Sequence, residues 1–105
     1  MTQLDFLETV LRNEVENTNQ IHLFFHRETS EWYAYCRSAD NLQQLVPETK
    51  DTLTDELFSE AEVILARVSL NVELTERYAL PRYCELIGDD YALLNMKEKT
   101  EEETE

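Results

Sequence analysis

The sequence predicts a small α+β domain in which a mixed β-sheet of about four strands, with an N-terminal hairpin, is flanked by three helices. Three observations support this fold class. The chain has 105 residues, a length that suits one compact domain. Apolar residues make up 42% of the chain and aromatic residues 10%, which is enough for a hydrophobic core. Segments with apolar residues at steps of three and four alternate with β-prone aromatic runs.

The first helix is predicted from a helical spacing of apolar residues at Leu4, Leu7, Val10, Leu11 and Val15. Thr2 is placed to cap its N-terminus. Asp5 and Glu8 follow early in the helix, where negative charge interacts favourably with the helix dipole. The pattern predicts an amphipathic helix that ends near Glu16.

A β-hairpin is predicted next, with strands at 21–26 and 32–36 around the polar loop 27–31. Ser38 then stands where the N-cap of a second, short helix is expected, and Pro47 closes that helix.

Two patterns compete over residues 53–74. Leu57, Ala61, Ile64 and Val68 fit one face of a helix, whereas apolar and polar residues alternate from Ile64 to Leu74. The alternation is longer and rich in β-branched residues, so it predicts a strand at 63–73 after a short helical or irregular piece at 54–61. One continuous helix over the whole segment stays open as the alternative.

The last part of the predicted domain is a helix within 75–87 and a strand at 91–96. Pro81 fits best in a first helical turn, so this helix is expected to begin near Leu80 and to end at Gly88. The predicted order is α-β-β-α-β-α-β. Residues 1–96 are expected to form the single domain, and the acidic residues 97–105 a flexible tail.

Net charge limits the partners of the chain. Its 9 Lys and Arg and 23 Asp and Glu give a formal charge of −14 at pH 7. Binding to nucleic acid or to an anionic membrane depends on basic residues, so both are poor default partners. A charge of this size chiefly keeps a small protein soluble, and it also suits docking on a basic protein surface. The sequence contains neither a long apolar stretch nor a basic, apolar start, which predicts a cytoplasmic protein that does not cross a membrane.

Few residues indicate a catalytic, cofactor-binding or metal-binding site. With one glycine in the chain, a glycine-rich phosphate loop is excluded. Cys36 and Cys84 lie in aromatic surroundings and are expected to be buried, reduced thiols. His22 and His26 share one face of their strand, but two ligands are too few for a usual zinc site, so they are expected to lie on the sheet surface. The sequence therefore predicts no enzyme activity, no cofactor and no catalytic metal.

The hairpin carries the candidate interaction surface, which combines aromatic side chains with nearby cations: Arg27, Trp32, Tyr33, Tyr35 and Arg37. Side chains alternate along a strand, so Trp32 and Tyr33 are expected on opposite faces. We expect Trp32 at or beside the functional surface, with a buried core tryptophan as the alternative, and Phe24 or Phe25 in the core.

Two stretches resemble the N-terminal, mismatch-recognition domain of the MutS family. The first is 23–39, with Glu31-Trp32-Tyr33-Ala34-Tyr35 at its centre, and the second is 83–94. The resemblance implies a mixed sheet with helices. The family's Phe-x-Glu motif matches the positions of Trp32 and Ala34, so the aromatic residue is kept and the glutamate is lost.

Taken together, these features predict a non-enzymatic accessory or interaction module of a bacterial-type cytoplasm that acts through protein contacts. A homodimer is an open alternative for its assembly. The alternative function is association with nucleic acid, either as a degenerate MutS-type reader of DNA or as an acidic mimic of DNA.

Overall fold

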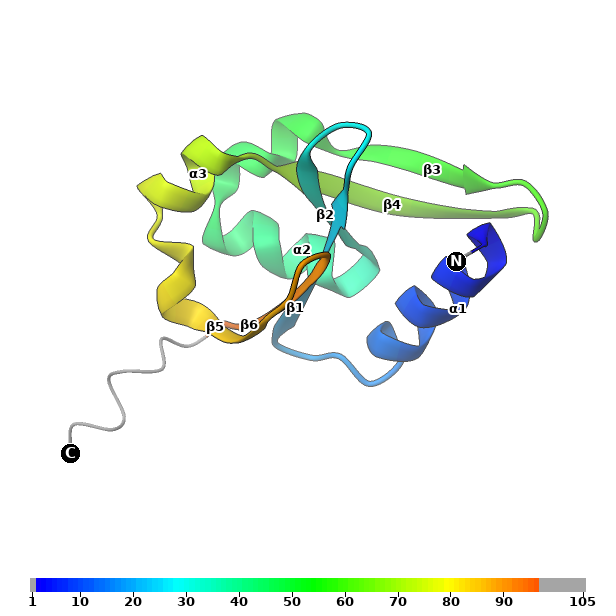
Figure 1. Cartoon of the computed structure of the whole chain (residues 1–105), viewed down its shortest axis with the longest axis horizontal. Coiled ribbons are helices and arrows are strands. Elements are labelled where there is room, and N and C mark those ends of the chain that lie inside the picture. The colour runs from blue at the N-terminus through cyan, green and yellow to red at the C-terminus, as the bar shows by residue number, and fades with distance from the viewer. Residues whose placement is uncertain (1, 97–105) are drawn as a thin grey trace.

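The computed structural model describes residues 2–96, and their arrangement is shown in Figure 1. Within this range the helices are α1 (Gln3–Glu14), α2 (Cys36–Leu45), α3 (Val72–Arg77) and two 3-10 helices, η1 (Pro47–Thr52) and η2 (Leu80–Tyr83). The strands are β1 (Gln20–His26), β2 (Glu31–Tyr35), β3 (Thr54–Phe58), β4 (Val63–Leu70), β5 (Cys84–Ile87) and β6 (Tyr91–Asn95). The acidic segment 97–105, predicted to be a flexible tail, lies outside the described residues.

Six strands of the described range form one sheet in the order β3-β4-β2-β1-β6-β5, and every neighbouring pair is antiparallel. The α+β class is confirmed. The predicted number of about four strands is close to the observed six but too low. The predicted mixed sheet is wrong, because every neighbouring pair is antiparallel. Short turns join the strands into three hairpins, β1–β2, β3–β4 and β5–β6. A short turn can join only antiparallel neighbours.

Helix α1 begins where the sequence predicts. The Thr2 hydroxyl accepts a hydrogen bond from the Asp5 N–H at 3.1 Å, and the Asp5 carboxylate accepts one from the Thr2 N–H at 3.4 Å. This capping box satisfies backbone donors of the first turn. The helix buries a narrower stripe than predicted, because Leu7 and Val10 are buried whereas three other predicted apolar positions are exposed: Leu4, Leu11 and Val15.

The predicted hairpin is confirmed as β1 and β2, in which Phe24 lies opposite Tyr33. Trp32 and Ala34 share one face of the sheet and Tyr33 the other, as the alternation predicts. Phe24 is buried in the core, which confirms that expectation.

Helix α2 confirms the second predicted helix but begins earlier. Cys36, predicted as the end of a strand, is its first residue and has a left-handed backbone conformation with φ 57° that turns the chain out of β2. The N-cap is Tyr35, not Ser38, which lies inside the helix and is fully buried. The helix ends at Leu45, before Pro47.

Strand β4 confirms the alternation over residues 63–70 and excludes one continuous helix over 53–74. The chain then leaves the sheet for α3, so the predicted strand is too long at its C-terminal end. The helical or irregular piece predicted at 54–61 is wrong, because residues 54–58 form the edge strand β3. Glu56 lies opposite Leu65 and Phe58 opposite Val63, so pairing with β4 decides the conformation of this acidic segment.

The helix predicted within 75–87 is also wrong in part. Helix α3 is short, Pro81 stands in the first turn of η2, and residues 84–87 form the edge strand β5. Gly88 does not cap a helix. Its N–H donates to the Tyr91 carbonyl at 2.7 Å, which closes the turn between β5 and β6. Strand β6 confirms the last predicted strand.

The sheet has two covered faces, each with its own core. The aliphatic face packs against α2 and η2 through a buried cluster: Ile21, Leu23, Ala34, Ala39, Leu42, Val46, Val68, Leu70, Leu80, Ala92 and Leu94. The aromatic face packs against α1 through a second cluster: Leu7, Val10, Phe24, Tyr33, Tyr35, Phe58 and Leu65. The β3–β4 hairpin, green in Figure 1, reaches over to α1. No helix of residues 2–96 is long and apolar enough to cross a membrane.

Candidate functional site

A groove on the aromatic face has a volume of about 700 Å³. One wall is α1 with its N-cap Thr2, and the helix itself contributes Phe6 and three polar residues: Gln3, Thr9 and Asn13. The other wall comes from the ends of two hairpins and carries charged or titratable residues: His26, Arg27, Glu28 and Asp90. Phe24, Phe58 and Tyr91 line it from the sheet, so the groove combines an aromatic floor with a polar, mostly acidic rim.

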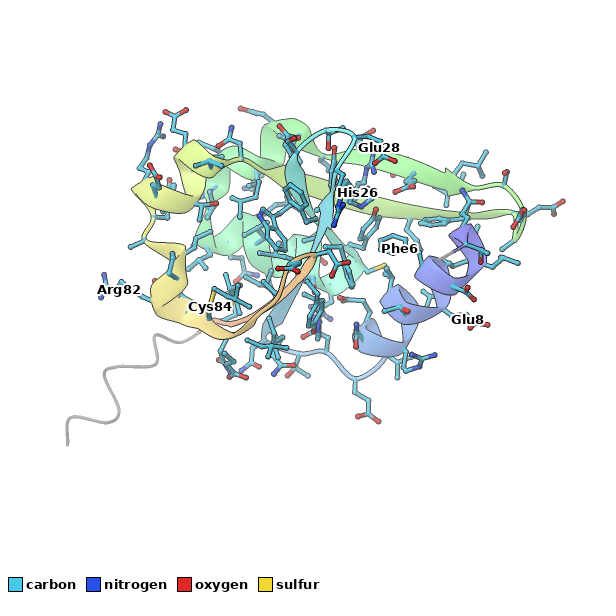
Figure 2. The ribbon with its side chains drawn as sticks, in the orientation of Figure 1. Phe6, Glu8, His26, Glu28, Arg82 and Cys84 are labelled. Carbon is cyan, nitrogen blue, oxygen red and sulfur yellow. The ribbon has the colours of Figure 1, made fainter. Side chains whose placement is uncertain are left out.

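Phe6 connects the helix to this floor. Its ring meets Phe24 edge to face at a centroid distance of 5.3 Å and meets His26 in the same way at 5.5 Å. Figure 2 shows Phe6 on the side of α1 that faces His26, with Glu28 beyond it and Glu8 projecting from the outer side of the helix. Edge-to-face contact is a favoured arrangement of aromatic rings, so Phe6 and Phe24 stabilise each other on the floor of the groove.

A polar cluster lies at the β3 end of the aromatic face. The Tyr35 hydroxyl donates to the Glu56 carboxylate at 2.6 Å, and Arg67 Nη1 donates to the same oxygen at 2.8 Å. The Arg67 guanidinium also lies over the Tyr33 ring, 4.4 Å from its centroid. Arg67 Nε is buried and has no hydrogen-bond partner within residues 2–96. Burial, together with the bond to Glu56, raises the pKa of Tyr35 well above its ordinary value of 10.0, so this phenol stays protonated.

His26 joins this cluster to the groove. Its Nε2 lies 3.4 Å from the Tyr35 hydroxyl, and its ring packs 4.5 Å from the Tyr33 ring centroid. Burial lowers the pKa of His26 below 6.5, which outweighs the opposite effect of Glu56. The imidazole is therefore mainly neutral at pH 7 and can either donate or accept a hydrogen bond.

His22 lies earlier in β1 on the same face, as the spacing predicts, but it is buried rather than on the sheet surface. Its Nδ1 lies 2.7 Å from the Tyr91 hydroxyl. Burial lowers the pKa of His22, against the effect of Glu14. Within residues 2–96 no group of three or more His, Cys, Asp or Glu side chains is placed to hold a metal ion.

The two cysteines lie against different cores. Cys36 packs against the aromatic-face cluster and Cys84 against the aliphatic-face cluster. Both are partly buried and neither forms a disulfide. Burial, with smaller effects of Glu14 and Asp40, raises the pKa of Cys36 above 9.0. A raised pKa disfavours the thiolate, which is the nucleophilic form.

The structure does not bring the five predicted surface residues together. Tyr33 and Tyr35 are buried on the aromatic face, whereas Trp32 is partly buried on the aliphatic face. Arg37 is exposed at the start of α2, at the opposite end of β2 from Trp32. Arg27 alone of the five lines the groove.

Sequence reasoning missed the residues that build the groove from distant elements, chiefly Phe6, Glu56, Phe58 and Tyr91. The local signal for Phe6 was its place beside Leu7 in an amphipathic helix. No local signal related Glu56 to Arg67, because the pairing of β3 with β4 brings them together.

Comparisons of the chain with models of protein families, with curated proteins and with solved structures found no match.

Proposed function

We propose that this chain is a non-enzymatic interaction module that holds a segment of a partner protein in the groove between α1 and the β1–β2 hairpin. The single observation that carries the proposal is the groove itself. A volume of about 700 Å³ falls within the range of ligand sites, about 300–1,000 Å³, and its floor is apolar with polar groups around it.

The protonation states around the groove favour binding over reaction. Tyr35 and Cys36 both have raised pKa values and hold their protons at pH 7, so neither supplies an activated nucleophile. His26 is mainly neutral and half-buried, which suits a hydrogen bond to a ligand. Hydrogen-bonding groups without an activated nucleophile are what an interaction module requires.

The shape of the groove favours a chain segment as its occupant. It is partly open to solvent, and Thr2, Thr9 and Asn13 line it from the N-cap and body of α1. A peptide backbone offers a regular series of donors and acceptors to such a polar wall, and its apolar side chains can contact the floor.

The nucleic-acid alternative has less support. A DNA reader would need Arg27, Trp32 and Arg37 exposed together, and Trp32 is partly buried on the aliphatic face. The formal charge of −14 also opposes binding to phosphates.

Peptide-display selection on the full chain tests the proposal. Peptides selected on the wild-type protein are measured by calorimetric titration against two α1 variants. Asn13→Trp fills the groove from its wall, whereas Glu8→Trp places the same bulk on the outer side of the helix. We expect Asn13→Trp to weaken binding by about tenfold or more and Glu8→Trp to change it little.

Circular dichroism of both variants establishes that they are folded. Selected peptides that bind the Asn13→Trp variant as tightly as the wild type would contradict the proposal, because their site would lie elsewhere. A selection that yields no peptide would contradict it as well.

A further inference from the structure

We infer that the segment held in the groove carries a lysine or arginine side chain, whose charged end lies at the acidic mouth of the groove while its stem crosses the aromatic floor. This inference rests on the proposed function and specifies its partner as a basic segment of another protein. Three sets of observations on the aromatic face support it.

The first observation is the charge at the mouth. Glu28 follows β1 and Asp90 precedes β6, so two separate turns each bring an exposed carboxylate to the same groove. Glu31 lies opposite His26 in the β1–β2 pair and adds a third carboxylate on this face. Arg27 is the opposing cation, so acids outnumber bases at the rim. Glu56 is already paired with Arg67 and contributes little.

The second observation is the floor. The Phe24 ring meets the Phe6 ring edge to face at a centroid distance of 5.3 Å and packs at a tilt against the Tyr91 ring at 5.4 Å. Aromatic faces attract cations within about 6 Å of the ring centroid, and the long stems of lysine and arginine gain contact on an apolar surface.

The third observation is that the same face already binds one cation in this way. Arg67 lies over the Tyr33 ring while Glu56 accepts a hydrogen bond from its guanidinium. The site of Arg67 combines an aromatic ring with a carboxylate, and the groove is lined by the same two kinds of side chain, Phe6 and Glu28.

Charge also decides against a second copy of this chain as the occupant. Each copy carries a formal charge of −14, so two copies repel each other, whereas a basic segment is attracted from a distance. The partner is therefore a protein of opposite charge.

The test uses the full chain and a ten-residue peptide that alternates lysine with valine. The control peptide has the same sequence with every lysine acetylated, which removes the charges and keeps the length. Isothermal titration calorimetry at physiological salt compares the wild type with Glu28→Arg and Glu8→Arg. Both substitutions change the net charge by the same amount, but Glu28 lines the groove and Glu8 projects from the outer side of α1.

We expect the lysine peptide to bind the wild type, Glu28→Arg to weaken binding by about tenfold and Glu8→Arg to weaken it less than about threefold. Equal losses in the two variants would overturn the inference, because the attraction would then be non-specific. Equal binding of the acetylated peptide would also overturn it but would leave the proposed function standing. Absence of binding by the lysine peptide overturns the inference, and the display selection then decides the proposed function separately.

A second pair of variants tests the floor. Phe6→Tyr keeps an aromatic face, whereas Phe6→Leu keeps apolar bulk without one. We expect Phe6→Leu to weaken binding of the lysine peptide by about three- to fivefold and Phe6→Tyr to retain wild-type affinity. Circular dichroism should show that both variants are folded. Equal affinities for the two variants would show that no cation lies over this ring, contrary to the inference.

Discussion

The Ser38 hydroxyl donates a hydrogen bond to the Glu14 carboxylate at 2.5 Å, while the Ser38 N–H donates to the other oxygen of the same carboxylate at 3.0 Å. Ser38 also accepts the backbone N–H of His22 at 2.9 Å and a bond from the Asn17 amide at 3.1 Å. One buried side chain thus ties the end of α1 to the start of β1 and the first turn of α2. This junction fixes where α1 crosses the aromatic face, and with it the position of the groove wall.

Replacing Ser38 tests this junction. Ser38→Ala leaves the buried N–H of His22 and one oxygen of Glu14 without this partner, which we expect to lower the free energy of unfolding by about 2–3 kcal/mol. Urea denaturation measures the loss. Ser59→Ala, in the exposed turn between β3 and β4, is the matched control and should cost less than about 0.5 kcal/mol. A loss at Ser38 as small as that of the control would show that the junction does not hold the helices.

The lowered pKa of His22 predicts how the free energy of unfolding depends on pH. Burial lowers its pKa in the folded protein below the ordinary value of 6.5. As pH falls, the unfolded chain therefore takes up a proton at this position before the folded chain does. The stabilisation is complete above the ordinary pKa and is lost as pH falls from there through the lowered folded pKa.

The measurement is the free energy of unfolding of the wild type and of His22→Asn between about pH 8 and 5. We expect the wild type to lose stability on acidification and the variant to lose less over the same range. His26 also has a lowered pKa, so the single variant should still lose some stability on acidification. The double variant His22→Asn/His26→Asn should lose less stability than the single variant. Parallel slopes for all three proteins would show that neither histidine causes the loss of stability.

The spacing of residues close together in the sequence predicted those elements whose conformation depends on nearby residues. The Thr2 cap, the β1–β2 hairpin and the alternation of β4 follow from short-range spacing and were predicted correctly. The edge strands β3 and β5 were missed because they are only five and four residues long and contain acidic residues, which are depleted in strands. Thr54 and Asp55 face solvent at the sheet edge, where acids are tolerated, and only pairing with β4 makes the segment extended.

The candidate site was less predictable than the fold. The shared face of His22 and His26 follows from a period of two along a strand. The groove, however, depends on Phe6 of α1 and Tyr91 of β6, which tertiary packing places across from the hairpin. The predicted aromatic surface was expected to be exposed, but Tyr33 and Tyr35 are buried in the aromatic-face cluster.

The β3–β4 hairpin provides a test of the corrected strand. Phe58 is fully buried against α1, whereas Leu57 and Ile64 face each other on the opposite side and are 57% and 62% exposed. We expect Phe58→Ala to lower the free energy of unfolding by about 3–5 kcal/mol and Leu57→Thr to change it by less than about 0.5 kcal/mol. Chemical denaturation measures both variants, and similar losses for the two would contradict the alternation of faces along β3.

The ion pair between Glu56 and Arg67, at the β3 end of the aromatic face, should have a larger coupling energy than an exposed ion pair. Glu56 and Arg67 have side chains that are 24% and 23% exposed, and Tyr35 adds a hydrogen bond to the same carboxylate. A double-mutant cycle with Glu56→Gln and Arg67→Met should give a coupling energy of about 0.5–2 kcal/mol. The same cycle on the exposed Arg77–Glu73 pair is the control, with about 0.2–0.5 kcal/mol expected. Equal couplings would show that partial burial adds nothing to the inner pair.

Trp32, expected from the sequence at a functional surface or in the core, lies between these two extremes. It is partly buried on the aliphatic face, opposite Leu70, with its ring 5.2 Å from that of Phe25. It also lines a small apolar hollow of about 90 Å³ beside Leu80 and Cys84. Trp32→Ala enlarges this hollow but removes only part of a buried ring, so we expect it to cost about 2 kcal/mol, less than the roughly 3–5 kcal/mol of a fully buried aromatic residue. Trp32→Phe should restore most of that loss in urea denaturation. A cost near zero would instead place Trp32 on an exposed surface, and complete unfolding would place it in the core.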